Sequence, residues 1–381
     1  MGAAVIQSIE SNSESMQHFP SISLVVISRN EARCIERCLL SARDSVDRML
    51  VLDTGSTDDT IAIATCCGAV VHRTEWPGDF SSARNLALTL ADADWNLVMD
   101  ADEWLEEGGK SLRAARTSLP FLGIVQVKSD DESAGQKLQN ISWISRWLPR
   151  GVRYEGRIHE QPVSVLPRVR MPVILGHDGY SQHQMAKKRG RNRSMLVQTL
   201  GHEPNNPYVL YQLAKDHEAY EDLSLAADLY LRAFELMPSD AAYRHDLCVR
   251  LLYCLGRSDR IDQALTLAAD LLDELSDSPD YFFTLGNLFL DKAVQQPEQA
   301  VQQWLPHAQA AWMRCLDIGE HPELDGAVLG RGSFLAAHNL AVLCEGSGDS
   351  EGAEQYQDLS KRLRGVIDPD HQPKKGVASA A

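Results

Sequence analysis

Hydrophobic positions in the first hundred residues fall into short apolar runs separated by stretches of helical periodicity. The runs are Ile22–Ile27, Met49–Leu52, Ala69–Val71 and Trp95–Met99. Between them, apolar residues recur every three or four positions over Ile35–Ala42, Ile61–Cys67 and Ala83–Ala91. Strands that alternate with helices in this way predict a parallel sheet with helices on both faces, a doubly wound, Rossmann-like α/β fold.

From about residue 204 the short runs give way to long amphipathic helical stretches. The pairs Leu213-Ala214, Leu247-Cys248, Leu285-Gly286 and Leu340-Ala341 follow one another at intervals of 34, 38 and 55 residues. The first interval is the period of the tetratricopeptide repeat. That first unit also has the small, aromatic, small and proline residues of the repeat, at Ala226, Tyr230, Ala233 and Pro238. In the later units Ala264, Ala308 and Ala353 match small positions, so we predict an all-α, tetratricopeptide-like region with insertions.

These patterns divide the chain of 381 residues into two domains and two tails. We expect a flexible tail over 1–19, where Ser, Asn, Gln and Glu dominate, and another over 367–381. The α/β domain is expected over 20–200 and the helical repeats over 204–366. This length exceeds what a single hydrophobic core usually organises, which agrees with two domains.

Charge and composition exclude several classes of function. The chain has 53 acidic against 37 basic residues, a net charge of −16, which disfavours a general nucleic-acid or anionic-membrane surface. The eight cysteines show no disulfide or zinc spacing, and no run approaches the roughly 18 apolar residues of a membrane helix. With no leader pattern at the start, we expect a cytoplasmic protein that does not insert into membranes and binds no nucleic acid.

Two carboxylates close the last apolar run. Asp100 and Asp102 follow Trp95–Met99 and so lie at the carboxyl end of a buried parallel strand, where open α/β sheets bind ligands. Residues two apart on extended backbone face the same way, so the pair can reach one hard cation and the phosphates it bridges. The identical spelling Asp92-Ala93-Asp94 precedes the strand, and we interpret it as a solvated turn.

A second carboxylate, Asp53, ends an earlier strand. Gly55 permits a sharp turn after it, and Ser56 and Asp58 suit the start of the next helix. Helix capping does not account for Asp53 itself, whereas a nucleoside ribose or base edge would. Arg84 lies one turn into the helix before the carboxylate strand, where its guanidinium can hold a carboxylate of the pair or a phosphate oxygen.

Four ordered motifs carry a resemblance to a known family. They are Ile27-Ser28-Arg29-Asn30-Glu31, Asp53-Thr54-Gly55-Ser56-Thr57-Asp58, Phe80-Ser81-Ser82-Ala83-Arg84-Asn85 and Asp100-Ala101-Asp102-Glu103. Together they resemble a family-2 glycosyltransferase of GT-A fold. The segments Tyr154–Glu160, Gly176–Tyr180 and Lys187–Asn192, followed by repeats, resemble the subgroup with tetratricopeptide units. That subgroup includes peptide S-glycosyltransferases, flagellin glycosyltransferases and enzymes of lipopolysaccharide core assembly.

The resemblance implies a hexosyltransferase that depends on Mn²⁺ or Mg²⁺. It implies a nucleotide-sugar site of Ser28, Arg29, Asn30, Glu31, Asp53, Ser56, Asp58, Arg84, Asp100, Ala101, Asp102, Lys187 and Lys188. It assigns the metal to Asp100, Asp102 and His177, with Asp102 as the direct ligand. Lys187 and Lys188 would meet the leaving diphosphate, although a solvated helix face also explains that basic run.

For the acceptor side we predict Glu160 as the general base, with His159 orienting it or serving instead. Consecutive residues on a strand point in opposite directions, so only one of the two is expected to face the sugar. The predicted reaction is an inverting transfer from a nucleotide sugar, a UDP-sugar by resemblance, to a protein or peptide hydroxyl or thiol. The repeats would bind that acceptor, brace the enzyme or form a homo-oligomer.

Three alternatives stay open. The acceptor can be a saccharide or lipid-linked molecule of the lipopolysaccharide core type. The chain can also be a non-catalytic repeat scaffold, against which the intact charged motifs speak. An enzyme that makes nucleotide sugars would share the doubly wound fold, but it usually has a glycine-rich loop after the first strand, where this chain has residues 28–31 without glycine.

Overall fold

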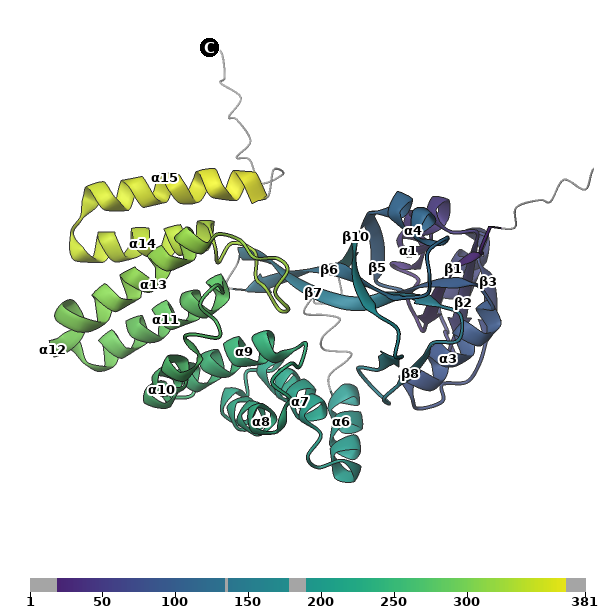
Figure 1. The fold of residues 1–381 in the computed structure, drawn as a ribbon, viewed down its shortest axis with the longest axis horizontal. Coiled ribbons are helices and arrows are strands. Elements are labelled where there is room, and N and C mark those ends of the chain that lie inside the picture. Colours follow the sequence, from purple (N-terminus) through teal and green to yellow (C-terminus); the bar gives the residue numbers. More distant parts are fainter. Residues whose placement is uncertain (1–18, 134–135, 178–189, 368–381) are drawn as a thin grey trace, which may run out of the picture.

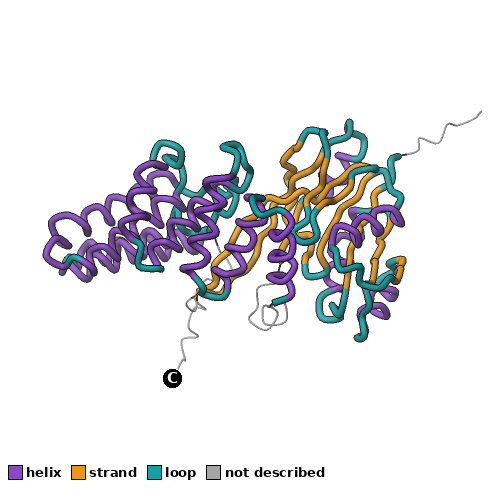
Figure 2. The backbone as a smooth tube through the Cα atoms, turned by 90° about the horizontal axis from the view of Figure 1, so that it is seen from below, coloured by secondary structure: helices purple, strands orange, loops and turns teal. Residues whose placement is uncertain are grey.

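The computed structural model describes residues 19–133, 136–177 and 190–367. It contains a twisted sheet flanked by helices and, beside it, a curved row of antiparallel helices (Figures 1 and 2). A long hairpin of β6 (Leu122–Ser133) and β7 (Gln136–Pro149) reaches from the sheet towards the helical row. This order of elements confirms the predicted fold class, an α/β domain followed by an all-α repeat region.

The first half of the sheet is parallel, as predicted. Its strands stand in the order β3-β2-β1-β4, and β1 pairs in parallel register with both β2 and β4. The elements of this half are β1 (Ile22–Ser28), α1 (Ile35–Ala42), η1 (Arg43–Ser45), β2 (Arg48–Asp53), α2 (Thr60–Cys66), β3 (Val70–Arg73), α3 (Phe80–Ala91) and β4 (Trp95–Asp100). The carboxyl ends of these strands therefore share one edge of the sheet.

The second half of the sheet is mixed, which the expectation of an all-parallel sheet did not include. The complete order is β3-β2-β1-β4-β7-β6-β10-β5, in which β7 runs antiparallel to both β4 and β6. The short β6–β7 connection explains this direction, because parallel neighbours need a long crossover. The remaining elements are β5 (Glu103–Glu107), α4 (Gly109–Ala115), β8 (Arg153–Glu155), β9 (Gln161–Val163) and β10 (Arg168–His177).

Apolar side chains cover both faces of the sheet. In β1, Leu24 and Val26 belong to one buried cluster while Val25 belongs to the cluster on the opposite face, as the alternation of side chains along a strand requires. Trp147 of β7 is completely buried and stacks on Trp95 of β4, with ring centroids 5.1 Å apart. This stack fixes β7 against the amino-terminal part of β4.

The helical part consists of antiparallel pairs, and no helix in the described ranges has the length and apolar character needed to cross a membrane. In the first pair, Ala226, Tyr230 and Ala233 are completely buried, as a repeat with close helix packing requires. The helices are α6 (Arg191–His202), α7 (Pro207–Ala219), α8 (Leu223–Leu236), α9 (Arg244–Arg257), α10 (Ile261–Leu271), α11 (Pro279–Gln295), α12 (Pro297–Gln299), η2 (Ala300–Trp304), α13 (Leu305–Ile318), α14 (Phe334–Ser347) and α15 (Ser350–Ile367).

The largest irregularity in the repeats joins the two parts of the molecule. The loop 319–333, between α13 and α14, lies against the β6–β7 hairpin (Figure 1). Trp143 of β7 donates its indole N–H to the carbonyl of Pro322 at 2.8 Å, and the backbone amide of Ile141 donates to Ala327 at 2.9 Å. Part of the sequence that lengthens the last repeat interval to 55 residues, the loop 319–333, therefore forms hydrogen bonds with the β6–β7 hairpin.

Close packing of α11 against α13 leads to a stability prediction. A Cβ at Gly286 would lie 2.4 Å from the indole nitrogen of the buried Trp312, so Gly286→Ala must displace the ring. We expect a net loss of about 1–3 kcal/mol in the free energy of unfolding, despite the better helix propensity of alanine. Gly346→Ala in α14 is the matched control, because a Cβ there meets nothing within 4 Å, and it should stabilise slightly. Denaturant unfolding of both variants checks this; an unchanged stability for Gly286→Ala would contradict it.

Candidate active site

The parallel strands bring three of the predicted polar residues to one edge of the sheet. The β1–β2 register places Ser28 beside Asp53, and their side chains lie 3.4 Å apart. On the other side of β1, Ile27 pairs with Asp100. The ends of β2 and β4 thus flank the end of β1.

The carboxylate of Asp53 is used by its own turn. It accepts the backbone amides of Gly55 at 3.0 Å and Ser56 at 2.8 Å, together with the hydroxyl of Ser56. The side chain is buried. The carboxylate of Asp53 therefore shapes this turn, a role that helix capping alone did not suggest.

The residues predicted after β1 are tied to the same turn. Asn30 has a left-handed backbone with φ of 58°. Its side-chain Oδ1 accepts the backbone amide of Thr57 at 2.8 Å, and its backbone amide donates to the hydroxyl of Ser56 at 2.8 Å. The carboxylate of Asp58 accepts the amide of Ala32 at 3.2 Å, and the amide of Glu31 donates to a threonine hydroxyl. Residues 29–31 and 55–60 therefore form one rigid rim beside the strand ends, with Arg29 exposed on it.

A chain of alternating charges runs through the centre of the site. Arg84 of α3 donates to Asp100 at 2.6 Å and to Glu160, and Arg146 of β7 donates to Asp100 at 2.7 Å and to Glu103. The side chains of both arginines, Glu103 and Glu160 are at most 8% exposed, whereas that of Asp100 is 36% exposed. Asp100, the middle member of this series of charged groups, is therefore the one that solvent reaches.

Burial and charge act in opposite directions on these carboxyls. Burial by itself would raise the pKa of Asp100, but the guanidinium groups of Arg146 and Arg84 outweigh it and hold this pKa well below its usual range. Burial raises the pKa of Glu103, against the charge of Arg146. Asp100 is therefore held in its charged form, and it is also the member that a ligand can reach.

Asp102 and His177 form a second group beside this chain. The β10–β5 pairing places His177 opposite Glu103, and its Nε2 atom lies 3.6 Å from a carboxylate oxygen of Asp102. The Nδ1 atom of the same ring is 3.0 Å from the hydroxyl of Ser129. Burial would lower the pKa of His177, but hydrogen bonding to Asp102 and the nearby carboxylates outweigh it and raise this pKa. Ala101, between the two aspartates, is buried.

The side chains of Asp102 and His177 suit a divalent cation that is also coordinated by a bound ligand. Within residues 19–133, 136–177 and 190–367, no group of three or more His, Cys, Asp or Glu side chains is arranged to hold a metal by itself. Asp102 and His177 supply one oxygen and one nitrogen, which fits a cation whose other positions are filled by phosphate oxygens and water. Both oxygens of Asp100, the other predicted metal ligand, accept hydrogen bonds from arginines.

The two predicted acceptor-side residues differ in their surroundings. Glu160 faces into the site on Arg84, whereas His159 is exposed and has a left-handed backbone with φ of 51°. The next residue, Gln161, donates to the hydroxyl of Tyr208 in α7 at 2.9 Å, and Ile158 packs against the core of the helical part. The segment that carries the predicted base therefore lies between the sheet and the helices.

Two parts of the prediction need a further statement. Lys187 and Lys188 lie outside the described residues. No motif marks Arg146, which lies within a strand. Tyr154 begins the segment Tyr154–Glu160 but had no predicted role, and its buried hydroxyl has no hydrogen-bond partner among the described residues. Burial raises the pKa of Tyr154 to about 12, and the ring centre lies 5.5 Å from the guanidinium carbon of Arg84.

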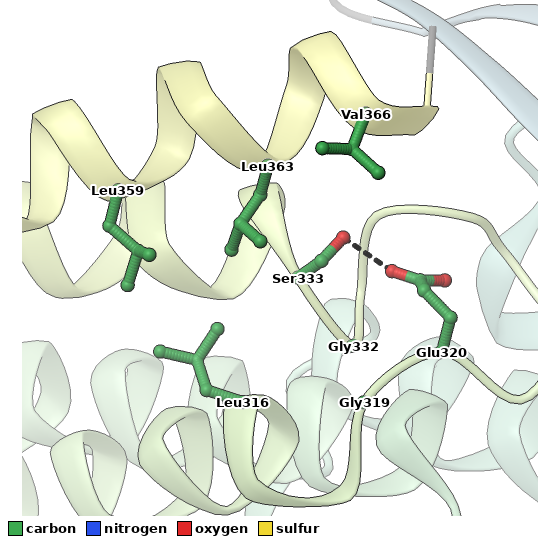
Figure 3. Close-up of a pocket in the computed structure, with 8 residues that line it drawn as sticks. All are labelled: Leu316, Gly319, Glu320, Gly332, Ser333, Leu359, Leu363 and Val366. Carbon is green, nitrogen blue, oxygen red and sulfur yellow. Dashed lines mark hydrogen bonds between the residues drawn. The ribbon is translucent and has the colours of Figure 1, made fainter.

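A separate cavity of about 420 Å³ lies in the helical part, between α13, α15 and the loop that joins α13 to α14. Leu316, Leu359 and Leu363 form its apolar side, and Ser333 donates a hydrogen bond to Glu320 at its polar side (Figure 3). None of the predicted site residues lines it. The strand-end group is therefore the candidate active site.

Comparison with known proteins relates the chain to a family of enzymes. Residues 23–155 match the model of glycosyl transferase family 2. The chain is 31% identical over 272 residues to a TPR repeat-containing protein of Synechococcus elongatus, a match that covers 68% of this chain and 67% of that protein. It is 30% identical over 276 residues to the SPbeta prophage-derived glycosyltransferase SunS of Bacillus subtilis, covering 67% of this chain and 63% of that protein.

The chain thus spans just under two thirds of the length of SunS. Among solved structures, that of MamA matches 50% of this chain and 98% of its own, with a TM-score of 0.37 and 14% identity. The family model covers the segments that contain Asp53, Arg84, Asp100 and Asp102, while the sequence match to the Synechococcus protein extends over two thirds of both chains. This chain therefore belongs to glycosyltransferase family 2, and helical repeats of the tetratricopeptide type follow its catalytic domain.

Proposed function

We propose that this chain transfers a sugar from a UDP-sugar to a hydroxyl or thiol of a protein or peptide, with a divalent cation and with inversion at the anomeric carbon. The observation that carries the proposal is the contact of Arg84 with both Asp100 and Glu160. This single guanidinium joins a strand-end carboxylate to the candidate base. A donor at the strand ends would therefore lie next to a group that can accept a proton.

On the donor side, Asp100 is suited to accept the ribose hydroxyls, because its partly exposed carboxylate is held in its charged form. Asp102 and His177 would hold the cation, with the diphosphate oxygens completing its coordination. The cation would neutralise the charge that develops on the departing nucleoside diphosphate. The predicted binding of phosphate by Lys187 and Lys188 and of the nucleoside by Asp53 remains part of this proposal.

On the acceptor side, Glu160 would take the proton of the attacking hydroxyl or thiol. The acceptor oxygen or sulfur forms a bond to the anomeric carbon while the bond from that carbon to the phosphate oxygen breaks. Uridine diphosphate leaves with the bonding electron pair, and Glu160 keeps the proton. Attack opposite to the leaving group inverts the anomeric centre, and Arg84 holds the carboxylate of Glu160 in place for it.

The helical part supports a protein or peptide as the acceptor. Its helix α7 contacts the segment of the base directly, through the hydrogen bond from Gln161 to Tyr208. Rows of helical repeats present extended surfaces on which peptides bind. An acceptor bound along these helices would thus end beside Glu160.

A donor panel tests the proposed activity. The purified chain is incubated with a series of nucleotide sugars and Mn²⁺, diphosphate release is measured, and candidate peptides, proteins and saccharides are examined for a mass increase of one sugar. We expect a UDP-sugar to be consumed and a protein or peptide to gain the mass, with the opposite anomeric configuration by NMR. A saccharide product would instead support the lipopolysaccharide-type acceptor, and the absence of both donor binding and turnover would support a non-catalytic scaffold.

Substitution of one carboxylate distinguishes the proposed metal site at Asp100-Ala101-Asp102 from the second Asp-x-Asp sequence, Asp92-Ala93-Asp94. We expect Asp102→Asn to lower Mn²⁺-dependent turnover by roughly 10²-fold or more, because the cation loses its charged ligand. Asp92→Asn is the matched control, since Asp92 lies in the other Asp-x-Asp, pairs with Arg150 and has a left-handed backbone that asparagine tolerates. Initial rates with and without Mn²⁺ provide the measurement, and full activity of Asp102→Asn would rule out this ligand.

A pair of substitutions identifies the base. Glu160→Gln keeps an oxygen for Arg84 but cannot take a proton, so we expect kcat to fall by about 10²–10⁴-fold while UDP–Mn²⁺ binding is retained. His159→Asn preserves a residue that tolerates positive φ and should leave kcat nearly unchanged. Steady-state kinetics and calorimetric titration with UDP and Mn²⁺ measure both effects. The reverse result, with kcat lost only in His159→Asn, would assign the base to His159.

A further inference from the structure

Arg146 occupies an unusual place for a strand residue in the middle of a sheet. Its side chain is 7% exposed, and its Nη2 atom donates to both Asp100 and Glu103. The Nε atom is buried and has no partner among the described residues. A buried charge destabilises a fold unless partners of opposite charge compensate for it. The partners of Arg146 are two carboxylates of the proposed site.

We propose that Arg146 is a positioning residue of the transferase site, which fixes the turn from Asp100 to Glu103 so that Asp100 and Asp102 face the donor together. The inference rests on the proposed function, because it assigns a donor to this turn. It adds a residue from within β7 to a site otherwise built from strand ends, the helix α3 and the segment of Glu160.

Hydrogen bonds close a ring around this turn. One carboxylate oxygen of Glu103 accepts the backbone amide of Asp100 at 2.8 Å, and the other accepts from Arg146. Arg146 also donates a hydrogen bond to the side-chain carboxylate of Asp100 at 2.7 Å. The backbone and the side chain of Asp100 are therefore both fixed through Arg146 and Glu103, and Asp102 lies inside the ring-closed turn.

The two arginines also determine how the carboxylate of Asp100 is oriented. Arg84 holds Oδ1 and Arg146 holds Oδ2, so rotation of the carboxylate would break one of the two contacts. Without Arg146, Asp100 would keep a single contact and could rotate. Glu103 would be left buried beside Asp100 without a cation, and two carboxylates in such proximity repel each other. The turn would then keep only the hydrogen bond from the Asp100 amide to Glu103, and the ring around it would be open.

The other side of the same turn depends on Glu103. The β10–β5 pairing places His177 opposite Glu103, and His177 lies beside Asp102. A displacement of Glu103 would consequently shift the strand pair that presents His177 to Asp102. Arg146 thus influences both the proposed ribose contact and the proposed cation ligands without touching the donor itself.

The test compares Arg146→Gln and Arg146→Lys with Arg150→Gln. Arg150 is a matched control, because it follows the same strand but pairs with Asp92 and Asp94, before β4 begins. Calorimetric titration gives the dissociation constant for UDP in the presence of Mn²⁺, thermal denaturation gives the stability of the free protein, and steady-state kinetics separate KM from kcat.

We expect Arg146→Gln to weaken UDP–Mn²⁺ binding and to raise the donor KM by about tenfold or more, with kcat changed by less than about threefold. Arg146→Lys should recover most of the affinity, because one nitrogen atom makes both contacts and a lysine ammonium supplies the same charge. Arg150→Gln should bind UDP–Mn²⁺ within about twofold of the original protein.

Folded Arg146→Gln that binds UDP–Mn²⁺ with unchanged affinity would overturn the inference, and so would an equal loss in Arg150→Gln. If Arg146→Gln does not fold, Glu103→Gln replaces it: Arg146 and the Asp100 amide use different oxygens of Glu103, and an NH2 group in place of one oxygen leaves one donor without its acceptor, so affinity should fall about fivefold. Unchanged affinity in that variant would also overturn the inference. Failure of the unsubstituted chain to bind UDP–Mn²⁺ would instead refute the proposed function.

Discussion

The carboxylate of Asp100 between two buried arginines is the interaction on which the site depends. Arg84 comes from α3 and Arg146 from β7, so three separate segments meet at this one side chain. The same arginines bring in Glu160 and Glu103, which gives five charged groups of alternating sign. Any one of them would be costly to bury alone, and together they satisfy one another. The sheet provides the geometry for this, because Trp147 stacks on Trp95 and fixes β7 against β4.

The fold was largely predictable where hydrophobic pattern and element type agree. The four apolar runs became β1 to β4 in parallel order, and the small residues Ala226 and Ala233 proved buried in the first helical pair. The mixed half of the sheet was not predictable, because strand order between β4 and β10 depends on which edges meet in space. The insertion in the repeats was visible as a long interval, but its pairing with Ile141 of the hairpin was not.

The same distinction holds for the site. Local motifs predicted polar groups at the strand ends, and parallel pairing brings Ser28 and Asp53 together. The structure gives Asp53 a structural role that its position alone did not reveal. The contact between Arg84 and Glu160 joins residues 76 positions apart, and Arg146 belongs to a strand without a motif, so neither contact follows from spacing. The two arginines, Arg84 and Arg146, are needed to explain why the carboxylate of Asp100 remains charged and keeps its orientation.

The central claim is that Asp102 and His177 hold a cation while Asp100, kept by its arginines, binds the nucleoside. A crystal structure of the chain with UDP and Mn²⁺, collected at a wavelength where manganese scatters anomalously, tests it most directly. We predict an anomalous peak within coordination distance of Asp102 and His177 Nε2, with both arginines still bonded to Asp100 and the ribose beside it. A manganese ion bound to Asp100, with Arg84 or Arg146 displaced, would contradict it.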